Sequence, residues 1–144
     1  MNLKPANRSE TLCHALLTLF LCIGTSIGLP AQAEVRSVYI QSRLDPNAIT
    51  ITEVDVVFVY NAQRLDSFPQ SKSVWYANRR DLIQQWDSDI DVVSVFIPQG
   101  FDSESVSLPD RRGEAVSVFI FGQHDSASAA PVDVTDAERV TVYI

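Results

Sequence analysis

The chain has 144 residues, the size of one ordinary domain, and 46% of them are hydrophobic, which is enough to build a packed core. It carries 18 acidic and 11 basic residues, so its formal net charge at pH 7 is −7. A surface of this sign repels nucleic-acid phosphates and anionic lipid headgroups. The composition therefore disfavours nucleic-acid binding and peripheral attachment to acidic membranes.

The first 33 residues have the layout of a cleavable secretory signal peptide. A short polar segment with Lys4 and Arg8 precedes an apolar run over residues 12–23. This run is too short to span a bilayer core of about 30 Å, which needs about 20 apolar residues. The sequence therefore predicts export to the periplasm, with residues 1–33 as signal peptide and residues 34–144 as a single domain.

The expected cleavage site follows Ala33. Signal peptidase needs small side chains at the first and third positions before the cut, and Ala33 and Ala31 supply them. The mature chain would begin at Glu34. Loss of residues 1–33 removes two basic residues and one acidic residue and leaves a net charge of −8.

Lipidation of Cys22 is the alternative to simple cleavage. A bacterial lipoprotein signal has a small residue before the modified cysteine, but here Leu21 takes that place. We therefore expect no direct membrane binding unless Cys22 is lipidated. The other cysteine, Cys13, also precedes residue 34, so the mature domain has no disulfide and depends on its core for stability.

The mature chain shows mainly strand periodicity, with β-branched and aromatic runs between clusters of Pro, Gly, Asp and Asn. Runs 54–59, 90–97 and 116–121 are apolar on both faces, so we expect them in the middle of a sheet. A shift of the apolar phase between Ile51 and Val54 predicts a bulge or two shorter strands. The fold class is mainly β, an antiparallel β-sandwich with one helical insertion between strands. The expected strands are 35–41, 49–60, 90–97, 103–108, 115–121 and 139–144, and a short helical turn covers 61–67.

The helical insertion is predicted to begin after Ser71 or Ser73, either of which can cap it, and to end near Trp86. Trp75 and Trp86 fall on one side of this helix, at the spacing of core residues, and Arg79 is expected to face outward. The tryptophans are therefore interpreted as packing residues that cover the second face of a sheet.

Catalytic and metal sites find little support. His124 is the only histidine of the mature chain, and it adjoins Asp125, but no glycine-framed nucleophile accompanies it. We therefore predict no enzymatic activity and no cofactor.

The run 87–91 begins like a calcium loop, with carboxylates at alternating positions. An EF-hand would then need glycine at the sixth place and glutamate at the twelfth, where this chain has Val92 and Pro98. Alternation also places these aspartates on one side of the strand that begins here, where they would keep the junction between helix and strand hydrated. We therefore expect no metal site.

The order of elements carries a family resemblance. An opening strand over 35–40 with valine and tyrosine is followed by a helical insertion, a strand, a Pro-Gln-Gly turn at 98–100, and a late strand, 116–121, that ends in an aromatic residue. This layout resembles the TssJ-like family, the small periplasm-facing subunits of the type VI secretion membrane complex. That family consists of lipoproteins, and its Pro–Gly turn lacks the inserted Gln99.

The resemblance implies a non-enzymatic periplasmic interaction or structural subunit of a bacterial envelope secretion apparatus, with a protein partner in the cell envelope. A free periplasmic binding module for peptide or carbohydrate is the alternative. Such a module would need exposed aromatic side chains, for which Tyr39, Tyr76 and Tyr143 are candidates.

The segment that joins the first two strands is the expected partner-binding surface. The resemblance implies a contact near the first strand, and a leucine between charged neighbours, stiffened by proline, offers an apolar anchor. An ordinary polar turn is the alternative, and the edge strand 139–144 is the next candidate surface. The predicted contact residues are Arg43, Leu44, Asp45, Pro46 and Asn47.

Overall fold

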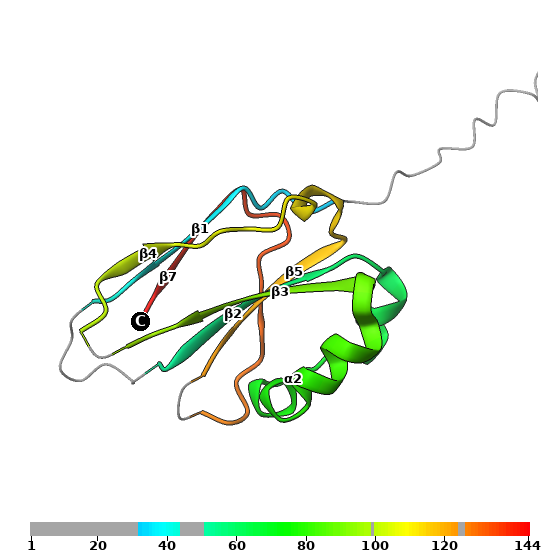
Figure 1. The fold of residues 1–144 in the computed structure, drawn as a ribbon, viewed down its shortest axis with the longest axis horizontal. Helices are drawn as coiled ribbons and strands as arrows, with labels where there is room; N and C mark the ends of the chain where they lie inside the picture. Colours follow the sequence, from blue (N-terminus) through cyan, green and yellow to red (C-terminus); the bar gives the residue numbers. More distant parts are fainter. Residues whose placement is uncertain (1–31, 44–50, 99, 124–125) are drawn as a thin grey trace, which may run out of the picture.

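The computed structural model describes residues 32–43, 51–98, 100–123 and 126–144. These residues form two β-sheets packed face to face, and one α-helix lies on the outer side of one sheet (Figure 1). The predicted fold class, a mainly β sandwich with one helical insertion, is confirmed. No helix in the described ranges is long and apolar enough to cross a membrane.

The smaller sheet, which we call sheet A, has the strand order β4-β1-β7. β1 (Ser37–Gln41) lies in the middle, antiparallel to β4 (Ser103–Ser105) and parallel to β7 (Arg139–Tyr143). The parallel pair differs from the all-antiparallel arrangement predicted from the sequence. It is possible because parallel strands require a long crossover, and all the strands of the second, larger sheet lie between β1 and β7 along the chain.

The larger sheet, sheet B, has the order β3-β2-β5-β6 and is antiparallel throughout. It consists of β3 (Ile90–Phe96), β2 (Glu53–Val59), β5 (Ser117–Gly122) and the two-residue β6 (Val132–Asp133). β2 and β5 are interior strands, as expected. The prediction that residues 90–97 lie in mid-sheet is wrong, because β3 forms an edge.

The shift of apolar phase before β2 coincides with an irregular start of the strand. Thr52 donates its backbone N–H to the carbonyl of Gln123 at 3.1 Å, while Gln123 donates to the carbonyl of Glu53 at 2.8 Å. Two consecutive residues thus face one residue of the neighbouring strand, which is the pattern of a β-bulge. From Val54 onward the register with β5 and β3 is continuous.

The helical insertion is α2 (Lys72–Trp86), and Ser71 is its N-cap, because its hydroxyl accepts a hydrogen bond from the Val74 N–H at 3.4 Å. A 3₁₀ helix, η2 (Ala62–Ser67), precedes α2 where the short helical turn is predicted. The insertion therefore runs from β2 to β3 and crosses the outer face of sheet B (Figure 1).

The molecule has two apolar cores, one between the sheets and one beneath α2. Even-numbered residues of β1, β2 and β5 fill the first, among them Ile40 and Val56. The second contains Phe68, Trp75 and Phe121, and the ring centroids of the last two lie 5.0 Å apart. Both tryptophans are buried, so their interpretation as packing residues is correct.

The segment before β1 is also bound into the domain. Ala33 is 8% exposed and belongs to the core between the sheets. Its N–H donates to the carbonyl of Ala115 at 2.8 Å, and the next N–H, of Glu34, donates to the carbonyl of Thr135 at 2.9 Å. The residues on both sides of the expected cleavage site thus take part in the folded structure.

Candidate interaction surface

The outer face of sheet A is an exposed surface that no helix of the described ranges covers (Figure 1). Along β1 and β7 buried or half-buried residues alternate with exposed ones, because successive strand residues point to opposite faces. The odd-numbered residues of the three strands point outward. This surface, which we call the open face, consists of Ser37, Tyr39, Gln41, Ser103, Ser105, Arg139, Thr141 and Tyr143.

Two exposed tyrosines lie close together on the open face. In the parallel register Tyr39 lies opposite Thr141, and Gln41 lies opposite Tyr143. Tyr39 and Tyr143 are thus diagonal neighbours on one face, at a spacing within reach of aromatic side chains. They are 37% and 52% exposed, so a large part of each ring remains available to a partner.

Arg43 connects the two candidate surfaces that the sequence suggested. Its guanidinium carbon lies 4.4 Å from the centroid of the Tyr143 ring, a cation–π contact, and its N–H donates to the carbonyl of Ile144 at 2.9 Å. The beginning of the predicted contact segment therefore lies beside the end of the predicted edge strand. Arg43, the described residue of that segment, and the edge strand thus meet at one end of the open face.

The open face is basic on an acidic protein. Arg139 belongs to it and Arg43 adjoins it, whereas no carboxylate occupies its positions, although the whole chain has a net charge of −7. Tyrosine and arginine are enriched in protein–protein interfaces and among the residues that dominate binding energy. The hydroxyl, amide and guanidinium groups here suit a partner with carbonyl or carboxylate groups.

Tyr76, the third aromatic candidate, does not belong to this surface. It lies on α2 over the other sheet, and its hydroxyl donates to the carbonyls of Phe121 at 3.4 Å and Glu53 at 3.5 Å. Burial, together with the nearby carboxylates of Asp55 and Glu53, raises the pKa of the Tyr76 phenol well above its usual range. The ring therefore serves to attach the helix to sheet B.

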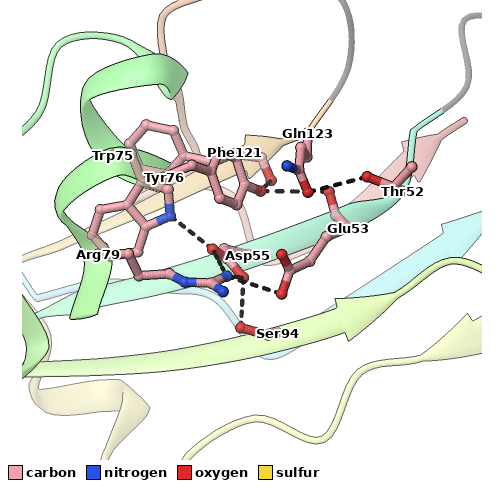
Figure 2. A network of polar contacts seen from close by, with 9 residues as sticks. All are labelled: Thr52, Glu53, Asp55, Trp75, Tyr76, Arg79, Ser94, Phe121 and Gln123. Carbon is pink, nitrogen blue, oxygen red and sulfur yellow. Dashed lines mark hydrogen bonds and ion pairs between the residues drawn. The ribbon is translucent and has the colours of Figure 1, made fainter.

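A buried carboxylate organises the contact between α2 and sheet B (Figure 2). Asp55 of β2 is fully buried and accepts hydrogen bonds from the indole Nε1 of Trp75 at 2.7 Å and from the Ser94 hydroxyl at 2.6 Å. The Nη1 of Arg79 lies 2.8 Å from one oxygen of Asp55 and 2.9 Å from Glu53. Because protein groups satisfy this carboxylate on all sides, its role is structural.

Arg79 is the clearest error among the predicted side-chain orientations. The sequence placed it outward, since it is charged and lies on an amphipathic helix. In the structure Arg79 points toward sheet B (Figure 2). The buried carboxylate of Asp55 attracts the guanidinium, and this ion pair compensates for the water that the guanidinium loses on burial. One signal was present in the sequence: an aspartate, Asp55, within the otherwise apolar run 54–59.

Two of the three aspartates that imitate a calcium loop, Asp89 and Asp91, are engaged in ion pairs. Asp91 binds Arg111 through two contacts of 2.8 Å and accepts the hydroxyl of Tyr60 at 2.7 Å. Hydrogen bonding from Arg111 lowers the pKa of the Asp91 carboxyl. Asp89 instead binds Arg64 at 2.8 Å. The two carboxylates thus engage different arginines, which tie η2 and the loop after β4 to the start of β3.

A cavity of about 560 Å³ lies between residues 32–36 and residues 110–113, next to Glu138. Its lining contains the exposed ion pair of Arg36 and Glu138, at 3.2 Å, and no aromatic side chain. Carbohydrate sites usually place sugar rings on aromatic residues, and the described lining of this cavity has none.

Several residues singled out in the sequence lie outside the described ranges, and the predictions about them stand as predictions. They are Cys22, Ala31, Leu44, Asp45, Pro46, Asn47, His124 and Asp125. Of the predicted contact segment only Arg43 is described.

Comparisons of the chain with protein-family models, with curated proteins and with solved structures gave no match. A proposal for its function therefore rests on its own residues and their arrangement.

Proposed function

We propose that the protein is a non-enzymatic interaction subunit of a bacterial envelope secretion apparatus of the type VI kind, which binds a protein partner in the periplasm. The observation that carries the proposal is the open face, where Tyr39, Tyr143 and Arg43 gather on a basic surface of an acidic chain. Its composition is that of a protein interface.

The arrangement of the domain supports the same proposal. The sequence resemblance to TssJ-like subunits implies a small sandwich with a helical insertion, and this chain has that layout. The most buried polar group, Asp55, is used to hold the insertion in place. The buried polar network thus stabilises the scaffold that presents the open face.

A peptide- or carbohydrate-binding module is the second candidate. The observation in its favour is the pair of exposed tyrosines on one face, since such rings can stack on sugars as well as on proteins. Isothermal titration with oligosaccharides from the cell envelope separates the two functions, because the secretion subunit should give no heat of binding.

The main test is recovery of the partner from membrane and periplasmic fractions with a tagged, exported protein. The double variant Tyr39→Ala/Tyr143→Ala should lose the partner, because it removes both exposed rings of the open face. Phe96→Ala is the matched control, since Phe96 is 70% exposed but lies on sheet B. Equal recovery by the two variants, or a partner unrelated to a secretion complex, would contradict the proposal.

A further inference from the structure

The edge of β7 has unused backbone hydrogen-bonding groups. β7 bonds to β1 through its even-numbered residues: the Ile144 N–H donates to the carbonyl of Gln41 at 3.1 Å, and the Glu138 carbonyl accepts from Ser37 at 3.3 Å. Backbone groups alternate in direction along a strand. Those of the odd-numbered residues therefore point away from β1, and no described residue bonds to them. These residues are Arg139, Thr141 and Tyr143.

Among the four sheet edges, β7 is the one best suited to accept an added strand. β4 and β6 contain only three and two residues. β3 is longer, with seven residues. Its large exposed side chain is Phe96, and this apolar ring does not indicate the chemistry of a partner strand. β7 has five residues, lacks proline and continues directly into the open face. Natural edges of this kind are usually protected by charges, proline or bulges.

The charges along β7 indicate the chemistry of a strand that could be added to this edge. Arg139 stands at one end, and Arg43, stacked on Tyr143, stands at the other. Arg139 has no ion-pair partner among the described residues, and the outward positions between the two arginines carry no carboxylate. An extended segment with carboxylates near its ends would match this pattern. A second copy of the chain would bring the same two arginines and a net charge of −7, so the charges disfavour self-pairing.

We propose that β7 binds an extended, acidic segment of the protein partner as an additional strand of sheet A. This inference rests on the proposed function and specifies how the partner is held. Backbone hydrogen bonds to residues 139, 141 and 143 supply affinity, and the two arginines together with Tyr143 select the acidic sequence. The added strand would extend sheet A and place its own outward side chains beside the tyrosines of the open face.

The test uses two synthetic peptides of alternating valine and threonine, one flanked by glutamates and the other by lysines, with the ¹⁵N-labelled exported protein. The glutamate peptide should slow hydrogen exchange at the amides of residues 139, 141 and 143. It should bind at least about tenfold more tightly than the lysine peptide at low salt, and this difference should shrink at roughly 0.5 M salt, where charges are screened. Absence of protection, or equal binding of both peptides, would overturn the inference. Protection that rises with protein concentration alone would also overturn it, because the occupant would then be a second copy.

Proline substitutions locate the added strand. Thr141→Pro removes an N–H that the fold does not use and should abolish binding of the glutamate peptide. Phe96→Pro is the matched control, because Phe96 lies at the edge of sheet B, outside the open face, with its N–H also directed outward. Loss of binding in both variants, with melting temperatures unchanged, would contradict strand addition at β7.

Charge reversal provides a second measurement if Thr141→Pro fails to fold. Arg139→Glu should invert the preference from the glutamate peptide to the lysine peptide. Arg80→Glu, on the exposed side of α2, should leave the preference unchanged. An unchanged preference in Arg139→Glu would overturn the acidic specificity.

Recovery of the cellular partner separates this inference from the proposed function. If Tyr39→Ala/Tyr143→Ala loses the partner but Thr141→Pro retains it, the open face is the interface and strand addition is wrong. If the glutamate peptide protects β7 and Thr141→Pro loses a partner that is unrelated to a secretion complex, strand addition is correct and the proposed function fails.

Discussion

Replacement of Trp75 by phenylalanine should show how much the hydrogen bond to the buried carboxylate of Asp55 contributes to the free energy of unfolding. The variant keeps an aromatic ring against Phe121 but removes the indole N–H that donates to Asp55 at 2.7 Å. Both Trp75 and Asp55 are fully buried, so water cannot replace the lost donor. A hydrogen bond to a charged group contributes about 1.5–3 kcal/mol. Arg79 and Ser94 still bind the carboxylate, which keeps the expected loss within that range.

Trp86→Phe is the matched control for this experiment. Trp86 is 3% exposed and packs in the same core, but among the described residues no carboxylate accepts its indole N–H. Both variants lose the same ring volume, so the difference between them isolates the hydrogen bond to Asp55. We expect Trp75→Phe to be less stable than Trp86→Phe by about 2 kcal/mol in urea unfolding followed by far-ultraviolet circular dichroism. Equal free energies of unfolding would refute the structural role assigned to Asp55.

Three further predictions concern the core, the ion pairs and processing. Trp86→Ala should lower the free energy of unfolding by about 3–5 kcal/mol, because the side chain is buried, and a variant that melts within a degree or two of the parent would contradict this. Arg111→Gln should cost up to about 1 kcal/mol at pH 7, since this partly exposed arginine holds the pKa of Asp91 below its unfolded value. That contribution is present above the ordinary aspartate pKa of about 3.9 and disappears as the pH falls through the lower folded pKa, so urea unfolding of parent and variant should converge in acid. Intact-mass measurement of periplasmic protein should give a chain that begins at Glu34, and acyl chains on Cys22 would refute this processing.

Local features of the sequence were sufficient to predict the helical insertion and most strands. Ser71 can cap a helix, and Trp75 and Trp86 recur at helical spacing, so the boundaries of α2 follow from residues within or next to it. The same holds for β2 and β5, whose apolar runs are long and bounded by turn residues. The two-residue β6 has no such pattern and could not be predicted.

The position of a strand within its sheet is harder to predict than its existence. β3 is apolar on both faces because sheet A covers one side and α2 covers the other. Those faces determine which residues are apolar, whereas β3 contains no proline or basic side chain of the kind that often marks an edge strand. An apolar run therefore predicts coverage of both faces and does not distinguish an edge strand from a central one.

The candidate surface could be predicted only in part for a similar reason. Tyr39 and Tyr143 were recognisable as candidate aromatics, but they are neighbours on one face only because β1 pairs with β7, which lies far away along the chain. Arg79 shows the opposite case, where a residue that looked exposed is directed inward by Asp55, a partner on another element. Contacts between distant segments of the chain determine the position of the tyrosines and the orientation of Arg79, and local periodicity does not predict such contacts.

If the predicted signal peptide is removed after Ala33, the burial of that residue sets an order in time for folding and cleavage. A peptidase must bind its substrate as an extended chain, but the backbone of Ala33 and Glu34 is hydrogen-bonded to Ala115 and Thr135 in the folded domain. If the chain is processed after Ala33 as predicted, cleavage must therefore occur before this segment docks between the sheets, and the mature domain loses the Ala33 hydrogen bond. A precursor that folded first would protect its own cleavage site, so delivery of an unfolded chain to the peptidase becomes a kinetic requirement for release.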